Sequence, residues 1–276
     1  MSILDILSPN SLLQESHISP ELFFTTTTES VSKSPIDSYL YQTRDLIRLA
    51  TPDQLNNHPG LGGLAVLGIV SYVERYVRTL LNKLVGINSQ CRFRCQDMQI
   101  RFGSIDWYQP EQIGLALMDR LALSGSKEIK ERINNFLAID ITKNEAIKEA
   151  LSDYTKLCEI RHCIVHSAGY IGAFNAQNLG LSDNYNTSIA NPEFTTIHAS
   201  LASMENMVRL INQHVCNSVF EDGFIPEKNG IFIGEWEQVR DVFYNNLSIF
   251  WCELDLGPIQ NPLVEGFFIK LQDRFT

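Results

Sequence analysis

The most regular pattern of apolar residues in the chain runs from Gly62 to Val85. Apolar side chains recur there at every third or fourth position: Val66, Val70, Val73, Val77, Leu80 and Leu84. This spacing places them on one face of an α-helix. Further apolar residues widen that face, so we expect this helix to lie at the centre of the fold.

Helical spacing recurs along most of the chain, whereas alternating, strand-like patterns are scarce. Further helices are predicted over residues 36–50, 110–123, 126–137, 142–168, 194–220, 236–254 and 263–275. Thr142 and Glu145 form a capping-box pattern at the start of the helix over 142–168. Residues 170–192 are rich in Asn, Gly and Ser, which predicts a long polar loop or a small hairpin. The predicted fold is mainly α: an antiparallel helical bundle with N- and C-terminal attachments and this long polar loop.

The expected organisation is a helical core at residues 59–222 between two flanking segments. Residues 1–58 are expected to form an attachment of short helices and loops. Residues 223–276 are expected to form an acidic extension. From Val219 to Thr276 there are ten acidic and four basic residues, which contribute −6 to the net charge of −10.

Composition narrows the class of protein. Of the 276 residues, 44% are hydrophobic and 20% are charged, as in a globular domain rather than a disordered chain. The net charge of −10 disfavours general binding to nucleic acid or to an anionic membrane, although a local basic patch can still bind RNA. The six cysteines show no Cys-x-x-Cys pair, which favours reduced thiols.

We expect a cytoplasmic protein without a membrane span. The N-terminus lacks the basic and apolar regions of a signal peptide. The longest uncharged apolar stretch, Pro59 to Val73, is shorter than the roughly 20 residues that a membrane helix needs. Neither a glycine-rich phosphate loop nor a Gly-x-Ser-x-Gly elbow occurs, which argues against an ATPase or a serine hydrolase.

The candidate chemistry lies at the end of the predicted helix over residues 142–168. Its apolar positions are Ile147, Leu151, Tyr154, Cys158, Val165 and Ala168. The missing step falls on Arg161, and a guanidinium is costly to bury unless it is paired or used. His162 and His166 lie one turn apart on a neighbouring face. We therefore interpret this segment as the candidate active site.

The pattern of Arg161, His162 and His166, with the flanking Glu-Ile-Arg-His and the following Ser-Ala-Gly, resembles the motif helix of the HEPN superfamily. These proteins are small α-helical bundles, and many of them are metal-independent endoribonucleases. The resemblance covers about residues 60–220. It implies an RNA-cleaving toxin or anti-phage defence effector that needs neither a cofactor nor a metal.

The resemblance also implies a role for each residue. His166 acts as the general base on the ribose 2′-hydroxyl or as the acid for the leaving 5′-oxygen, roles that suit a side chain titrating near neutrality. Arg161 holds the scissile phosphate and stabilises the pentacovalent state. His162 orients the phosphate or serves as a second acid or base. The products end in a cyclic phosphate and a 5′-hydroxyl.

The spacing of the motif predicts a homodimer. Arg161 and His166 are five residues apart, which places them about 140° apart around an ideal helix. Members of the superfamily usually pair two motif helices across a two-fold axis, so we expect two copies of the chain to share one cleft. The candidate substrate-binding residues are Glu74, Arg75, Arg78 and Tyr170.

The expected regulator differs from one known in the superfamily. In toxins neutralised by a nucleotidyltransferase antitoxin, the modified residue is a tyrosine two positions after the histidine. Ala168 occupies that position here. A different antitoxin, or an associated defence protein, is therefore the expected protein partner beside RNA.

The same arginine-to-histidine spacing occurs a second time, at Arg209 and His214. The first copy is favoured because its arginine interrupts an apolar stripe. A polar residue follows Arg161, whereas Leu210 follows Arg209. The first copy also ends its helix before a polar loop that a substrate can approach.

Three other interpretations of the segment stay open. Cys158, His162 and His166 follow one another at single turns and can bind zinc, although the neighbouring arginine would repel a cation. The bundle can also be a non-catalytic module for dimerisation or for binding a nucleotide or a protein. Finally, the arginine can pair with a buried carboxylate such as Glu74 or Asp153.

A second stretch, Cys91-Arg92-Phe93-Arg94-Cys95, alternates arginine with an aromatic residue. Such a pattern can bind a nucleic-acid strand, with charge for phosphate and the ring for a base. It is equally typical of a strand or loop with one apolar side, and the shortness of the stretch favours this simpler interpretation.

Overall fold

The computed structural model describes residues 18–24 and 33–275. The chain divides into two compact units, residues 1–32 and 33–276. The described part of the first unit contains one short 3-10 helix, η1 (Pro20–Phe23). This division lies at residue 32, and the predicted boundaries after residues 58 and 222 stay a prediction. Residues 1–17 and 25–32 of the predicted attachment lie outside the described part.

The described residues of the second unit are helical with short connections. The α-helices are α2 (Pro35–Leu49), α3 (Pro52–Asn57), α4 (Gly60–Ile87), α5 (Ser89–Arg94), α6 (Phe102–Trp107), α7 (Ile113–Met118), α8 (Ser126–Leu137), α9 (Glu145–His166), α10 (Ala173–Leu179), α11 (Phe194–Gly223), α12 (Trp236–Phe250), α13 (Glu253–Leu256) and α14 (Asn261–Phe275). The 3-10 helices are η2 (Pro110–Gln112), η3 (Ile141–Lys143), η4 (Asp183–Tyr185) and η5 (Pro226–Lys228). No strand occurs in 18–24 or 33–275, where an isolated bridge joins Tyr170 to Ile189. The predicted mainly α fold is confirmed.

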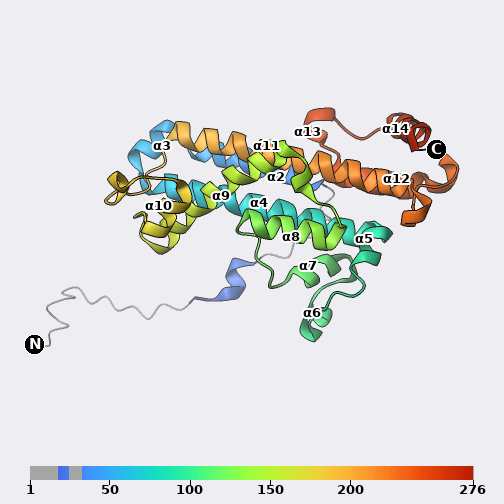
Figure 1. The fold of residues 1–276 in the computed structure, drawn as a ribbon, viewed down its shortest axis with the longest axis horizontal. Coiled ribbons are helices and arrows are strands. Elements are labelled where there is room, and N and C mark those ends of the chain that lie inside the picture. Colours follow the sequence, from blue (N-terminus) through green and yellow to red (C-terminus); the bar gives the residue numbers. More distant parts are fainter. Residues whose placement is uncertain (1–17, 25–32, 276) are drawn as a thin grey trace, which may run out of the picture. The chain divides into compact units, whose positions relative to one another are not determined.

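Helices α2, α4, α9 and α11 form the bundle and lie alongside one another (Figure 1). The connections α3 and α10 lie at one end of the bundle and α5 lies at the other, so successive bundle helices run in opposite directions. Helix α4 packs against the other three and against α7. Val73, Val77 and Leu80 on α4 have no exposed surface. The predicted central position of this helix agrees with that packing.

Buried polar contacts join the flanking segments to the bundle. The Asp37 carboxylate on α2 is 2% exposed and accepts hydrogen bonds from the backbone amides of Glu253 and Leu254, at 3.1 and 3.3 Å. The Asn88 side chain after α4 donates to Asn246 on α12 at 2.8 Å. An unpaired buried polar group costs free energy, so these contacts fix the C-terminal segment against α2 and α4.

The local structure differs from the prediction at several places. The predicted helix over 110–123 is divided into η2 and α7, and the one over 236–254 into α12 and α13. Helix α9 begins at Glu145 because the Asn144 side chain caps it, whereas Thr142 lies in η3 with its hydroxyl donating to Asp140. The stretch around Phe93 is a helix, α5, because Asn88 caps it. The predicted polar loop after the motif contains α10, a seven-residue helix that ends at a left-handed Gly180.

No helix in the described ranges 18–24 and 33–275 has the length and apolar character to span a membrane.

Substitutions at Gly62 and Gly60 test how closely the first turn of α4 approaches the segment before α11. A Cβ at Gly62 would overlap the backbone carbonyl of Pro192, whereas a Cβ at Gly60 would meet nothing within 4 Å. We expect Gly62→Ala to lower the free energy of unfolding by about 1–3 kcal/mol, because backbone must move. Urea unfolding followed by circular dichroism measures this change.

The matched control is Gly60→Ala in the same helical turn. It is expected to leave stability unchanged or to raise it by less than about 1 kcal/mol, since alanine favours the helix over glycine. Equal stability of the two variants would contradict the close approach of α4 to Pro192.

Candidate functional site

The three motif residues lie in the last two turns of α9, at the end of the bundle where α10 follows (Figure 1). The Asn144 cap and the buried Ile147, Leu151 and Tyr154 anchor the first part of α9 against the core. Burial is less complete around the motif, although Cys163 is still 3% exposed. Val165 is 43% exposed, and Ala168 lies beyond the helix in the left-handed region at φ 51°. The predicted apolar stripe is therefore wrong for these two residues.

Arg161 is half-buried and faces a carboxylate on α4. Burial raises the pKa of the half-buried Glu74, and the positive charges of Arg161 and Arg78 act in the opposite direction. A guanidinium group lowers the pKa of a carboxyl group only when it lies near that group. Of the predicted site residues, the structure brings these three together.

Arg161 makes no hydrogen bond and no ion pair with any residue in the described ranges. The sequence left open whether Arg161 pairs with a buried carboxylate. In the structure, Arg161 acts on Glu74 through its charge but forms no salt bridge with it. Asp153 is engaged elsewhere, since it accepts from Lys156 at 2.9 Å and from Ser203 at 3.3 Å. Arg161 thus keeps its guanidinium donors for another acceptor.

Arg78 lowers the pKa of Glu74 and also forms hydrogen bonds with the backbone. Its guanidinium donates to the backbone carbonyl of Met118 at 2.9 Å and to that of Leu121 at 2.5 Å. Met118 is the last residue of α7, and Leu121 lies in the connection between α7 and α8. Arg78 is therefore held in place by the backbone, and substrate binding by its remaining donors stays a prediction.

His162 and His166 are both exposed, and their rings are in contact at 4.6 Å between centroids, tilted by 48°. They lie one turn apart at the surface, next to Arg161 along the helix. Arg75 and Tyr170, two of the predicted substrate-binding residues, are exposed as well. The structure places Tyr170 in the bridge to Ile189 just after the motif.

The second arginine-to-histidine pair differs in its contacts. Arg209 on α11 donates to Glu205 at 2.8 Å and forms a salt bridge with Asp255 on α13. Its guanidinium therefore has two carboxylate partners within the chain. This contrast with Arg161 supports the choice of the first copy.

The zinc interpretation gains no support from the geometry. No group of three or more His, Cys, Asp or Glu side chains in the described ranges is placed to hold a metal ion. Burial raises the pKa of the Cys158 thiol to about 12, so this group is protonated at neutral pH. A protonated thiol is a poor metal ligand, because the thiolate is the binding form.

Glu159 was not predicted, although it belongs to the motif segment. Its carboxylate accepts from Asn175 at 2.7 Å and from Asn178 at 2.9 Å, and both amides lie on α10. These charge-assisted bonds fix α10 beside the motif turns. The polar composition of residues 170–192 was the available signal, but it does not reveal which asparagine side chains turn toward α9.

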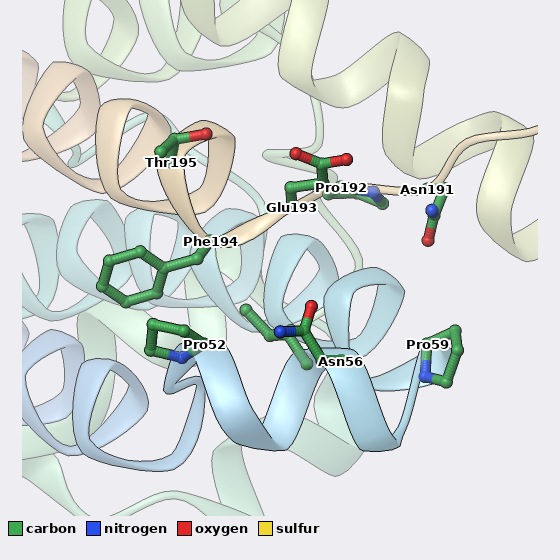
Figure 2. A pocket seen from close by; sticks show the side chains of 9 residues that line it. Pro52, Asn56, Pro59, Asn191, Pro192, Glu193, Phe194 and Thr195 are labelled. Atoms are coloured by element: carbon green, nitrogen blue, oxygen red, sulfur yellow. The ribbon is translucent and has the colours of Figure 1, made fainter.

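Two cavities open near the motif end of the bundle. The first has a volume of about 400 Å³ and is mostly apolar. One wall is formed by Leu157, Ile160 and Cys163 on α9, and the other by the segment from Gly169 to Pro192. The second, of about 320 Å³, lies where α3 meets the start of α11 (Figure 2). Its residues include Glu193 and neither arginine nor lysine, so it does not suit a phosphate.

Comparison with protein-family models, with curated proteins and with solved structures finds no match to this chain.

The raised pKa of Glu74 predicts how stability depends on pH. The folded state binds the Glu74 proton more tightly than the unfolded state does, so wild-type stability is lost as pH rises from 4.5 through the folded pKa. Glu74→Gln cannot ionise, and its stability relative to wild type should increase over that window. Urea unfolding of both proteins at pH 4 to 8 measures the difference.

The same urea unfolding series, with both proteins also carrying Arg161→Ala, tests the interaction between Arg161 and Glu74. Arg161 lowers the pKa of Glu74, so its removal should extend the decline to higher pH. A difference between wild type and Glu74→Gln that does not vary with pH would contradict this electrostatic arrangement.

Proposed function

We propose that the chain is a metal-independent endoribonuclease whose active site lies at the end of α9. The observation that carries the proposal is the state of Arg161: a half-buried guanidinium without a hydrogen-bonding partner in the described residues, adjacent to two exposed histidines whose rings are in contact. A cation with free donors beside titratable groups is suited to a phosphate that reacts by proton transfer. The resemblance of this segment to the HEPN motif helix supports the same assignment.

The reaction would be attack by the substrate on itself. A histidine accepts the proton of the ribose 2′-hydroxyl, whose oxygen then forms a bond to the adjacent phosphorus. The bond to the 5′-oxygen breaks, and that oxygen takes a proton from a second, protonated histidine. Arg161 stabilises the added negative charge on the phosphorus centre. His166 is the proposed base or acid, and His162 the residue that orients the phosphate or acts as its counterpart.

A homodimer would complete the site. Helix α9 is continuous from Glu145 to His166, so Arg161 and His166 diverge by about 140° around it. A second copy of α9 can supply the missing group on the other side of the phosphate. Exposed apolar residues near the motif support a contact there: Leu64, Val165, Tyr170 and Phe174 are 64%, 43%, 57% and 71% exposed.

The proposed biological setting is that of a toxin or an anti-phage defence effector. An RNA-cleaving enzyme of this kind requires control, so an antitoxin or an associated defence protein is the proposed partner. Ala168 stands where the modified tyrosine of nucleotidyltransferase-controlled toxins lies, and its exposed position offers no hydroxyl for that modification.

RNA cleavage by the purified protein tests the proposal. Wild type is expected to cleave in the presence of EDTA, and Arg161→Ala and His166→Ala are each expected to lose at least about 100-fold in rate. The assay uses end-labelled RNA, with analysis of the products for a cyclic phosphate. The matched control, His214→Ala, should retain wild-type activity because it alters the second arginine-to-histidine pair.

Loss of cleavage on chelation would contradict the metal-independent mechanism. A wild-type protein that binds RNA or another partner but cleaves no RNA would favour the non-catalytic module instead.

Mixing two inactive variants tests the shared site. If each site takes its arginine from one chain and its histidine from the other, a heterodimer of Arg161→Ala and His166→Ala contains one intact site. Co-refolded variants should then regain part of the wild-type rate, although each is inactive alone. Activity in the wild-type monomer, separated by sedimentation, would contradict the shared site.

A further inference from the structure

A third cavity lies away from α9, on the short helix α6. It has a volume of about 400 Å³ and is lined by Arg101, Gly103, Ser104, Trp107, Tyr108, Asp119 and Arg120. Helix α6 lies outside the bundle, beyond α7 (Figure 1). None of the lining residues belongs to α4 or α9, so this cavity is separate from the motif site. We call it the α6 pocket.

The wall of the α6 pocket is fixed by a carboxylate. Asp119 accepts a hydrogen bond from the Tyr108 hydroxyl at 2.9 Å and one from the Ser104 hydroxyl at 3.3 Å. Ser104 is buried, so the contact holds the connection after α7 against α6. A carboxylate has about four lone-pair positions, and two hydroxyl donors leave acceptor capacity for a ligand.

The other side chains around the α6 pocket lack partners. Arg101 and Arg120 are exposed and form no hydrogen bond or ion pair with the part of the chain that the structure describes. Trp107 is 79% exposed, which is unusual for the largest apolar side chain. Two free guanidinium groups, a free indole ring and a positioned carboxylate thus border the same cavity.

We propose that the α6 pocket binds one nucleotide of a single-stranded nucleic acid. The indole of Trp107 stacks on the base, as aromatic residues do in single-strand-binding proteins. Arg101 and Arg120 bind the flanking phosphates, and Asp119 accepts from a base amino group or a ribose hydroxyl. Binding here does not depend on chemistry at α9.

A strand fits the surface better than a free nucleotide does. Phe102 and Ile105 lie on the same helix outside the cavity and are 79% and 57% exposed. They offer further stacking surface for neighbouring bases beyond the one in the pocket. The one carboxylate of α6, Asp106, does not line the pocket. That the strand is RNA rests on the proposed ribonuclease function, for which this pocket would be a second point of attachment to the substrate.

The Arg-Phe-Arg stretch contributes little to this surface. Arg94 is tied to Asp222 at 2.8 Å and to the backbone carbonyl of Leu137, so its charge serves the fold. Arg92 and Phe93 are exposed on α5 but do not line the α6 pocket.

Binding of a fluorescein-labelled 2′-O-methyl oligonucleotide of about ten residues, followed by anisotropy, tests the proposal. This probe lacks the attacking hydroxyl, so the assay reports binding without cleavage. Trp107→Ala should raise Kd roughly 5- to 100-fold, and Trp107→Phe should restore most of the affinity. Arg101→Ala and Arg120→Ala should each reduce the slope of log K against log salt by about 0.7.

Two control variants separate this site from general effects. Arg240→Ala removes an exposed arginine on α12 and should leave Kd unchanged. Arg161→Ala should abolish cleavage of RNA, and adding Trp107→Ala to it should still raise Kd for the probe, so failure of either proposal can be recognised on its own.

Three outcomes would overturn the proposal. One is that the wild-type protein does not bind the probe, and another is that Trp107→Ala binds it as wild type does. The third is that adenosine monophosphate binds as tightly as the oligonucleotide, which would point to a free nucleotide as the ligand. Dimerisation that is lost in Trp107→Ala, without any binding of the probe, would assign the surface to a second copy of the chain instead.

Discussion

The enclosure of α4 by α2, α7, α9 and α11 is the constraint on which the rest of the structure depends. A polar group on so enclosed a helix needs a partner from a neighbouring element. Tyr76 donates to Asn212 on α11, and Asn82 accepts from the Leu115 amide on α7. Glu74 accepts no hydrogen bond from the described residues and has only nearby guanidinium charge. Glu74 therefore differs from Tyr76 and Asn82, and the charge of Arg161 on α9 acts on it.

Long periodic helices could be predicted from the sequence because their burial repeats over many turns. The predicted helices over 62–85 and 194–220 correspond to α4 and α11, with ends that differ by at most three residues. Short helices could not be predicted, since α6 and α10 have six or seven residues and owe their position to tertiary contacts. The cap of α9 was misassigned because Asp140 competes for the Thr142 hydroxyl.

The partial burial of Arg161 could be predicted from the sequence, but its contacts could not. An arginine that interrupts an apolar stripe can be read from spacing, and Arg161 is indeed half-buried. Spacing along α9 alone does not decide whether Glu74 lies near that arginine, because the rotation of α9 against α4 depends on packing. The α6 pocket could not be predicted for the same reason. Its two parts, residues 101–108 and 119–120, are brought together by the hydrogen bonds of Asp119.

The hydrogen bonds of Arg78 give the molecule a property beyond stability. Arg78 holds the carbonyls of Met118 and Leu121, and the two residues between them, Asp119 and Arg120, border the α6 pocket. A ligand that shifts this connection displaces the Arg78 guanidinium, and the potential at Glu74 and Arg161 changes with it. One arginine side chain thus connects the wall of the α6 pocket to the charges around Arg161.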